Sequence, residues 1–95
     1  MSYKRGRRFE YRVKEKLERL GYVVIRSAAS KPIDLVALKA GCPPLFIECK
    51  LGKVTRRVEI ENQKALARLA GAKYLLITKE NLNELLDALP NTGCL

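Results

Sequence analysis

The segment from residue 45 to residue 78 constrains the fold more than any other part of this sequence. It begins with "LFIECK" (45–50), a short and mostly apolar strand pattern, and ends with a second one, "KYLLIT" (73–78). Between them, "IENQKALARLAGA" (60–72) carries apolar residues at helical spacing. Two strands that are joined through a helix lie parallel in one sheet with a right-handed crossover. The segment therefore predicts an α/β domain.

Further elements lie on both sides of this unit. Apolar spacing and turn residues predict a helix at 5–20, strands at 22–27 and 33–38, and a last helix at 81–89. The strand at 33–38 precedes a turn and is expected to form a hairpin with 45–50. The order α-β-β-β-α-β-α predicts a small mixed β-sheet with flanking helices. Three residues of the 60–72 helix are expected to face the sheet: Leu66, Leu69 and Ala70.

The length and the cysteines set broad limits. A chain of 95 residues has the size of one domain, so we expect a single domain over 1–95 with mobile ends at 1–5 and 90–95. No apolar run reaches the length of a membrane span and no secretion signal is visible, which favours a cytoplasmic protein. We expect free thiols and leave open whether two of the three cysteines pair: Cys42, Cys49 and Cys94.

The charge balance points to a nucleic-acid partner. Nineteen Lys and Arg face ten Asp and Glu, giving a formal net charge of +9, and so basic a small domain suits a polyanion. The chain contains no histidine, which excludes catalysis by a histidine base and zinc held by histidine. Any catalysis must use carboxylates, lysine, hydroxyls, thiols or an ion held by oxygen atoms.

Two acidic residues interrupt apolar strands. Asp34 lies in "IDLVAL" and Glu48 in "LFIECK", and the predicted hairpin would bring them to one end of the sheet. Two ionised carboxylates that are close and buried repel each other, and a hard divalent cation such as Mg²⁺ resolves the conflict. Because residues i and i+2 of a strand share a face, Lys50 lies beside Glu48 and can stabilise charge in a phosphate substrate.

Each of these signals alone has a structural interpretation. A lone aspartate at a strand end is more often a turn acceptor, and a lone Glu-x-Lys pair is more often a solvated ion pair. Their combination is more specific, because both acids lie in strands of one basic domain. Gln63, in the following helix, has two interpretations that we weigh equally: support of the active site, and a solvated polar position.

The residues quoted so far resemble the PD-(D/E)-x-K nuclease superfamily, which has the restriction-endonuclease-like fold. The signature stands here as "PID … ECK", with one residue inserted between Pro32 and Asp34. Within the superfamily, the chain most resembles the archaeal Holliday junction resolvases over about residues 4 to 78. The stretches that carry this resemblance are "KRGRRFEYRV", "GYVVIRSAASKPIDLVA", "FIECK" and "NQKALARLA". The chain departs from the family in having Tyr11 where an arginine usually follows the first acid.

The resemblance implies roles for individual residues. Asp34, Glu48 and the backbone carbonyl of Cys49 would hold the metal ion, and Glu10 would join them through water. Lys50 would position the attacking water, and Ser30 would touch the scissile strand, so that Glu10, Asp34, Glu48, Lys50 and Ser30 form the catalytic set. The implied DNA-binding residues are Lys4, Arg5, Arg7, Arg8, Arg26, Lys31, Lys53, Arg56 and Arg57.

The resemblance also implies a substrate and an assembly. It predicts a Mg²⁺-dependent endonuclease of DNA recombination and repair, with Mn²⁺ as a substitute, that makes paired nicks in four-way junctions. A two-fold symmetric junction suits a C2 homodimer, with the leucine face of helix 81–89 or the edge of the sheet as candidate contacts. Two alternatives remain open: a superfamily nuclease that cuts other branched or single-stranded DNA, and a non-catalytic nucleic-acid-binding protein.

Overall fold

A computed structural model describes residues 2–28, 31–52, 57–87 and 93–95 of the chain. Its elements follow the predicted order α-β-β-β-α-β-α, which is therefore confirmed. They are α1 (Ser2–Arg19), β1 (Val23–Arg26), β2 (Leu35–Leu38), β3 (Leu45–Lys50), α2 (Arg57–Leu69), β4 (Lys73–Thr78) and α3 (Leu82–Asp87). The two apolar strands β3 and β4 have the predicted bounds, whereas β1 and β2 are shorter than expected.

The four strands form one sheet in the order β1-β2-β3-β4. β1 pairs antiparallel with β2, and β2 pairs antiparallel with β3, as the predicted hairpin requires. β3 and β4 run parallel, with Glu48 opposite Leu76 and Lys50 opposite Thr78. The predicted strand–helix–strand crossover is thus confirmed, and the mixed sheet places the Glu-x-Lys strand in its interior.

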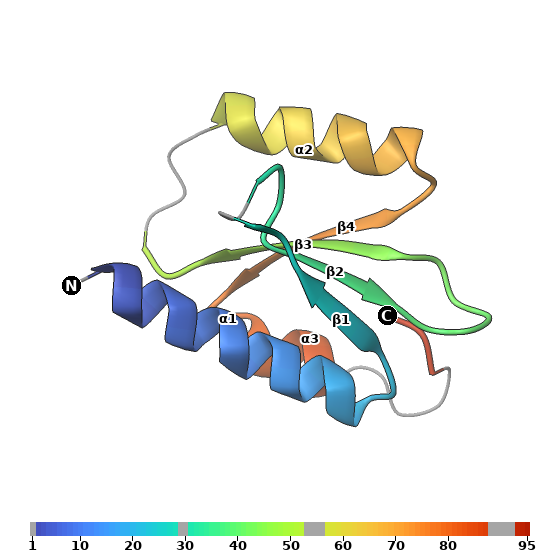
Figure 1. Ribbon diagram of the computed structural model, residues 1–95, viewed down its shortest axis with the longest axis horizontal. Coiled ribbons are helices and arrows are strands. Elements are labelled where there is room, and N and C mark those ends of the chain that lie inside the picture. The colour runs from blue at the N-terminus through green and yellow to red at the C-terminus, as the bar shows by residue number, and fades with distance from the viewer. Residues whose placement is uncertain (1, 29–30, 53–56, 88–92) are drawn as a thin grey trace.

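The sheet has a fully covered face and a partly covered face. α1 and α3 lie on one side and α2 lies on the other (Figure 1). Leu45 and Ile47 of β3 are completely buried on the α1 side, together with Leu35 of β2 and Ile77 of β4. Because strand residues alternate, Glu48 and Lys50 project toward the α2 side. The main core therefore anchors β3 from behind while its charged residues face the other way.

α1 is an amphipathic helix that covers the core face. Phe9, Val13 and Leu17 are buried at helical spacing. Gly21 ends the helix with a φ of 95°, and the backbone N–H groups of Gly21 and Tyr22 bond to the carbonyls of Glu18 and Leu17. This pairing satisfies the last helical carbonyls in a Schellman motif. In the described ranges, no helix is long and apolar enough to cross a membrane.

The inner face of α2 differs from the prediction. Leu69 is 88% exposed and Leu66 is 36% exposed, so the expectation that they face the sheet is wrong. The buried residues of the helix are Gln63 and Ala67, one turn apart. The small side chain of Ala67 lets the helix approach β4 closely, and Gln63 is tolerated inside because it is hydrogen-bonded. The leucines are left on the flank.

The C-terminal segment is fixed to the body of the domain. Cys42 and Cys94 form a disulfide, so the expectation of free thiols is wrong for these two residues and holds for Cys49. The disulfide joins residues that the fold brings to a Cα–Cα distance of 5.5 Å. The backbone N–H of Leu95 donates to the Tyr22 hydroxyl at 2.8 Å, and the Leu95 side chain packs on the core. These contacts hold residues 93–95 on the body of the domain, and the rest of the predicted mobile tail, 90–92, lies outside the described residues.

Candidate active site

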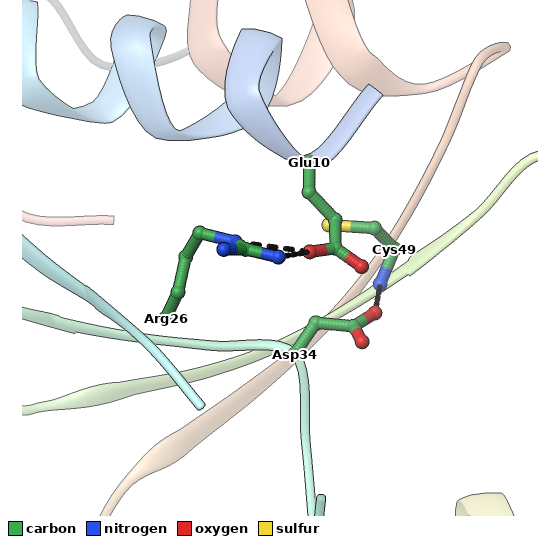
Figure 2. A network of polar contacts seen from close by, with 4 residues as sticks. All are labelled: Glu10, Arg26, Asp34 and Cys49. Carbon is green, nitrogen blue, oxygen red and sulfur yellow. Dashed lines mark hydrogen bonds and ion pairs between the residues drawn. The ribbon is translucent and has the colours of Figure 1, made fainter. Parts of the chain in front are cut away.

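Asp34 lies immediately before β2 and is only 5% exposed. Its Oδ2 atom accepts a hydrogen bond of 2.8 Å from the backbone N–H of Cys49 (Figure 2). Its backbone carbonyl accepts a second bond, from the backbone N–H of Ser27. The first bond reaches across to β3 and the second reaches back to the end of β1. The carboxylate is thus fixed against the Glu-x-Lys strand, at the end of the sheet that the sequence predicted.

Glu48 is the most isolated buried charge among the described residues. It is 6% exposed, and its Oε1 atom is buried without any hydrogen-bond partner. Its Oε2 atom lies 4.0 Å from the Nζ of Lys50, at the outer limit of an ion pair. The predicted pair on one face of β3 is present, but the lysine satisfies only one oxygen of the carboxylate.

The surroundings of Glu48 raise its pKa from 4.5 to about 7. Burial is the main cause, because it penalises the charged form, and the negative charge of Asp34 adds to it. Lys50 and the amide of Gln63 lower the pKa, although no hydrogen bond of standard geometry reaches Oε1. Among the described residues, the carboxyl group therefore lacks enough positive partners to hold its charge.

Glu10 approaches from α1 on the other side of the sheet. Its Oε1 atom accepts from Nε and Nη2 of Arg26, both at 3.3 Å, and Figure 2 shows the two side chains pointing toward each other. The guanidinium of Arg26 also lies 5.0 Å from the centre of the Tyr11 ring. Arg26 is thus placed between the acid and its chain neighbour, where cation–π attraction and ion pairing act together.

Cys49 lies between the carboxylates and is not a nucleophile. Burial, followed by the charges of Asp34, Glu10 and Glu48, raises the pKa of its thiol well above the usual range. A thiol attacks only as the thiolate, so this environment makes it inert. All three acids nevertheless act on one side chain, which places them around the same end of β3.

Gln63 connects three segments of the chain from its buried position on α2. Its Nε2 donates to the Pro32 carbonyl at 3.1 Å, in the loop before Asp34 that contains the cis Lys31–Pro32 bond. Its Oε1 accepts from the Tyr74 hydroxyl on β4 at 2.6 Å. The solvated interpretation of Gln63 is thus excluded by its 4% exposure.

The donor set suits a hard divalent cation. Asp34 and Glu48 offer carboxylate oxygens, and the unpaired Oε1 of Glu48 would gain most from a positive ion. In the part of the chain that the structure describes, no group of three or more histidine, cysteine, aspartate or glutamate side chains is arranged as ligands of one ion. The fit therefore rests on two carboxylates, with the side chain of Glu10 directed to Arg26.

The predicted DNA-binding residues other than Arg26, together with Ser30, differ in how far the structure describes them. Arg7, Arg8, Lys31 and Arg57 are exposed on the described surface. Lys4 and Arg5 belong to α1, but their side chains are not described, and Ser30, Lys53 and Arg56 lie outside the described residues. Their roles remain predictions.

Sequence reasoning missed two tyrosines of this site. Tyr11 was noted only as a departure from a family pattern, yet its ring carries Arg26. Tyr74 was assigned no role from the sequence, yet its hydroxyl donates to Gln63. The parallel register could have found Tyr74, because it pairs with Phe46, which lies on the Glu48 face of β3.

The mixed sheet between helices, with an aspartate before one strand and a Glu-x-Lys pair on the next, defines a small α/β domain of the nuclease type. Comparison with known families makes this specific. The model of the archaeal Holliday junction resolvase (Hjc) family matches residues 1–90, and the chain belongs to that family.

A curated relative agrees with this assignment. The chain is similar to a protein of Methanocaldococcus jannaschii named crossover junction endodeoxyribonuclease Hjc. The two are 37% identical over 84 residues, which cover 84% of this chain and 62% of the relative. The chain thus spans less than two thirds of the length of that relative.

Proposed function

We propose that this chain is a Mg²⁺-dependent DNA endonuclease that resolves four-way junctions by paired phosphodiester cuts during recombination and repair. Membership of the resolvase family supports the reaction class. The observation that carries the proposal is the buried Glu48 with an unpaired Oε1 atom, beside Asp34 and Lys50. A domain that needed only a basic surface to bind DNA would gain nothing from this arrangement.

The residues divide the work as follows. Mg²⁺, or Mn²⁺ in its place, supplies Lewis-acid stabilisation of the charge that develops on the phosphate. Asp34 and Glu48 hold the ion, with the Cys49 carbonyl as a further oxygen. The ammonium of Lys50 lies beside Glu48, where it orients the attacking water and stabilises negative charge. Exposed arginines of α1 and Arg57 contact phosphates and draw the DNA to the site.

Asp34→Asn tests the metal-nuclease proposal. The variant keeps the size of the side chain and an acceptor for the Cys49 N–H, but removes the charge that holds the ion. We expect it to bind a labelled four-way junction as wild type does and to cut it at least about 100-fold more slowly, as for loss of one strong electrostatic group. The measurement is junction cleavage in Mg²⁺ by gel electrophoresis, with chelator as the blank.

Glu18→Gln is the matched control, since it makes the same chemical change on the exposed pair with Lys14. Cleavage by Asp34→Asn at the wild-type rate would reject the metal-nuclease proposal. Equal cutting of junction and linear duplex would reject only the junction substrate and favour another nuclease of the superfamily. Salt-sensitive binding without any cutting by wild type would favour the non-catalytic alternative.

We further propose that the active form is a C2 homodimer that pairs through the α2 side of the sheet. Of the leucine face of the last helix, only the Leu82 side chain is described, and it is 2% exposed and packed in the core, so it is not available for the predicted contact. The α2 side instead has an apolar hollow of about 310 Å³, whose walls include Val36, Phe46 and Leu66. Leu69 lines the same hollow and is 88% exposed.

A protruding leucine beside an apolar hollow is self-complementary. In a two-fold interface, the same patch contacts itself, so Leu69 of one copy can enter the hollow of the other. An exposed apolar patch of this kind is more typical of an interaction surface than of solvent-facing protein. The two-fold symmetry of a four-way junction also requires two sites, one for each cut.

Leu69→Lys should shift the protein from dimer to monomer in sedimentation velocity, because the charge would be buried in an apolar contact. Asn83→Lys is the control: it adds the same charge to an exposed position of α3, on the opposite side of the sheet. If Leu69→Lys sediments as wild type does, this face is not the dimer contact.

A further inference from the structure

The hydrogen-bond partners of Gln63 determine which way its side-chain amide points. A backbone carbonyl can only accept, so the atom that faces the Pro32 oxygen must be the amide nitrogen. The amide oxygen then faces Tyr74, whose hydroxyl must donate. The two bonds require the same orientation of the amide, so the positions of its nitrogen and oxygen are assigned consistently.

The Tyr74 hydroxyl is suited to this task. It is a short donor at 2.6 Å on β4, the strand that runs parallel to the Glu-x-Lys strand. Burial and the nearby charges of Glu48 and Asp34 raise its pKa well above the usual range, so it stays protonated and can only serve Gln63 as a donor. Without it, the Gln63 oxygen would lose its donor, and only the bond to the Pro32 carbonyl would still orient the amide.

We propose that Tyr74 is a positioning residue for the active site, acting through Gln63. The hydroxyl of Tyr74 fixes the amide of Gln63, and the fixed amide fastens the Pro32 carbonyl two residues before Asp34. A single chain of hydrogen bonds thus joins β4, α2 and the segment that delivers Asp34 to β3. This inference deepens the proposed function and rests on it, because the pair positions the carboxylates that hold Mg²⁺.

The consequence concerns the spacing of the two acids. Asp34 lies in the loop just before β2 and Glu48 lies in β3, so the spacing of their carboxylates depends on contacts between these two segments. Two hydrogen bonds hold Asp34 in place relative to Glu48. One joins the Asp34 carboxylate to the backbone N–H of Cys49, next to Glu48, and the other holds the Pro32 carbonyl, two residues before Asp34, to Gln63. Loosening the second bond leaves the fold intact but lets the ligands move apart.

Tyr74→Phe is the direct test, with Tyr22→Phe as its matched control. Tyr22 also uses its hydroxyl in one 2.8 Å bond, but to Leu95 in the C-terminal segment. We expect Tyr74→Phe to weaken Mg²⁺ binding by about fivefold, as for one lost neutral hydrogen bond. Titration calorimetry without DNA measures the binding, and the Mg²⁺ concentration for half-maximal junction cleavage should rise by a similar factor. Tyr22→Phe should lower only the melting temperature.

A double variant separates positioning from general loosening. In a Gln63→Met background, Tyr74→Phe should have no additional effect on Mg²⁺ binding, because the hydroxyl acts only through the amide. Wild-type Mg²⁺ affinity in Tyr74→Phe, or an equal loss in Tyr22→Phe, would overturn the inference. If wild type binds Mg²⁺ but cuts no DNA while Tyr74→Phe binds it more weakly, the proposed function fails and the positioning role stands. If wild type binds no Mg²⁺, both are rejected.

Discussion

Burying the carboxylate of Glu48 in the middle of a sheet is energetically unfavourable, because the charge loses its contact with water. Burial raises the pKa of Glu48 from 4.5 to about 7, so the neutral carboxyl competes with the charged form near neutral pH. The neighbouring Asp34 and Lys50 act in opposite directions, and burial decides the balance. A group in this condition responds to small changes in its surroundings, which is why strongly shifted carboxyls cluster at functional sites.

The shifted pKa predicts a pH dependence of stability in the absence of metal. The folded pKa of about 7 lies above the unfolded value of 4.5, so the folded state holds its proton more tightly between these values. The free energy of unfolding should therefore fall as the pH rises from about 4.5 to about 7, by at most about 3 kcal/mol. Denaturant titrations of wild type and Glu48→Gln at several pH values measure it.

The difference between the two proteins isolates Glu48 from other titrating groups. Glu48→Gln should lack this part of the pH dependence, and adding Mg²⁺ should stabilise wild type more at about pH 8 than at about pH 5. If the free energy of unfolding depends on pH in the same way for both proteins, the pKa of Glu48 is not shifted by folding and this prediction is rejected.

The acidic residues of this site could be predicted from the sequence more fully than the contacts that surround them. Asp34, Glu48 and Lys50 stand out because charges interrupt apolar strands, and strand alternation then gives their common face. Arg26 and Gln63 were singled out, but their contacts with Glu10 and Tyr74 depend on how helices lie across the sheet. No spacing rule within one element contains that information.

At the scale of elements, the ends of the helices matter as much as their faces. α1 ends at Arg19, and Gly21, two residues further on, has a φ of 95°, which suits glycine. A β-carbon at this position would lie 3.1 Å from Cε of Lys39. Lys39 has little freedom to move, because its Nζ donates to the Leu20 carbonyl at 2.6 Å. The end of α1 is thus joined to the turn that follows β2.

Gly21→Ala should destabilise the protein by at least about 1 kcal/mol, which lowers the melting temperature by roughly 4–8 °C in a domain of this size. Both the left-handed backbone and the contact with Lys39 contribute. Gly6→Ala is the opposite control: Gly6 lies within α1 with nothing within 4 Å of the added carbon. It should raise stability by about 0.5–1 kcal/mol. Calorimetry that finds both variants destabilised would contradict this account of α1.

The elements themselves were predictable to differing degrees. β3 and β4 were predicted with correct bounds because their apolar runs are flanked by turn residues. α2 was placed at 60–72 but spans Arg57–Leu69, since Gly71 adopts a φ of 68° and ends the helix earlier. The prediction of its inward face was wrong, because apolar periodicity assumes that leucines point toward the core. Here a hydrogen-bonded glutamine occupies the inner face, and the leucines line the hollow.

At the scale of the whole molecule, the Cys42–Cys94 disulfide is the largest single constraint on the chain. It joins residues 52 positions apart, which the sequence left unpaired because three cysteines show no framework spacing. Disulfides are rare in reducing cytosol outside hyperthermophilic archaea and bacteria. Only the three-dimensional approach of the C-terminal segment to the β2–β3 turn reveals the pair.

Removing the disulfide should lower the free energy of unfolding by about 4 kcal/mol, since closing a loop of this length restricts the unfolded chain. A Cys42→Ser, Cys94→Ser double variant, unfolded in guanidinium chloride beside the oxidised wild type, measures the loss. Wild type treated with reductant should unfold like the double variant. Equal stability of oxidised and reduced wild type would show that the bridge does not form in solution.

The same bridge changes what a protease can release. Between residues 42 and 94 the backbone and the disulfide together form a covalent ring, which carries β3, α2, β4 and α3. A single peptide-bond cut inside this ring opens it without separating any piece, so the nicked protein keeps the mass of one molecule plus water. Two fragments would appear on a gel only after reduction. A cut between the end of β2 at Leu38 and Cys42 would instead free α1, β1 and β2 as soon as the protein is denatured.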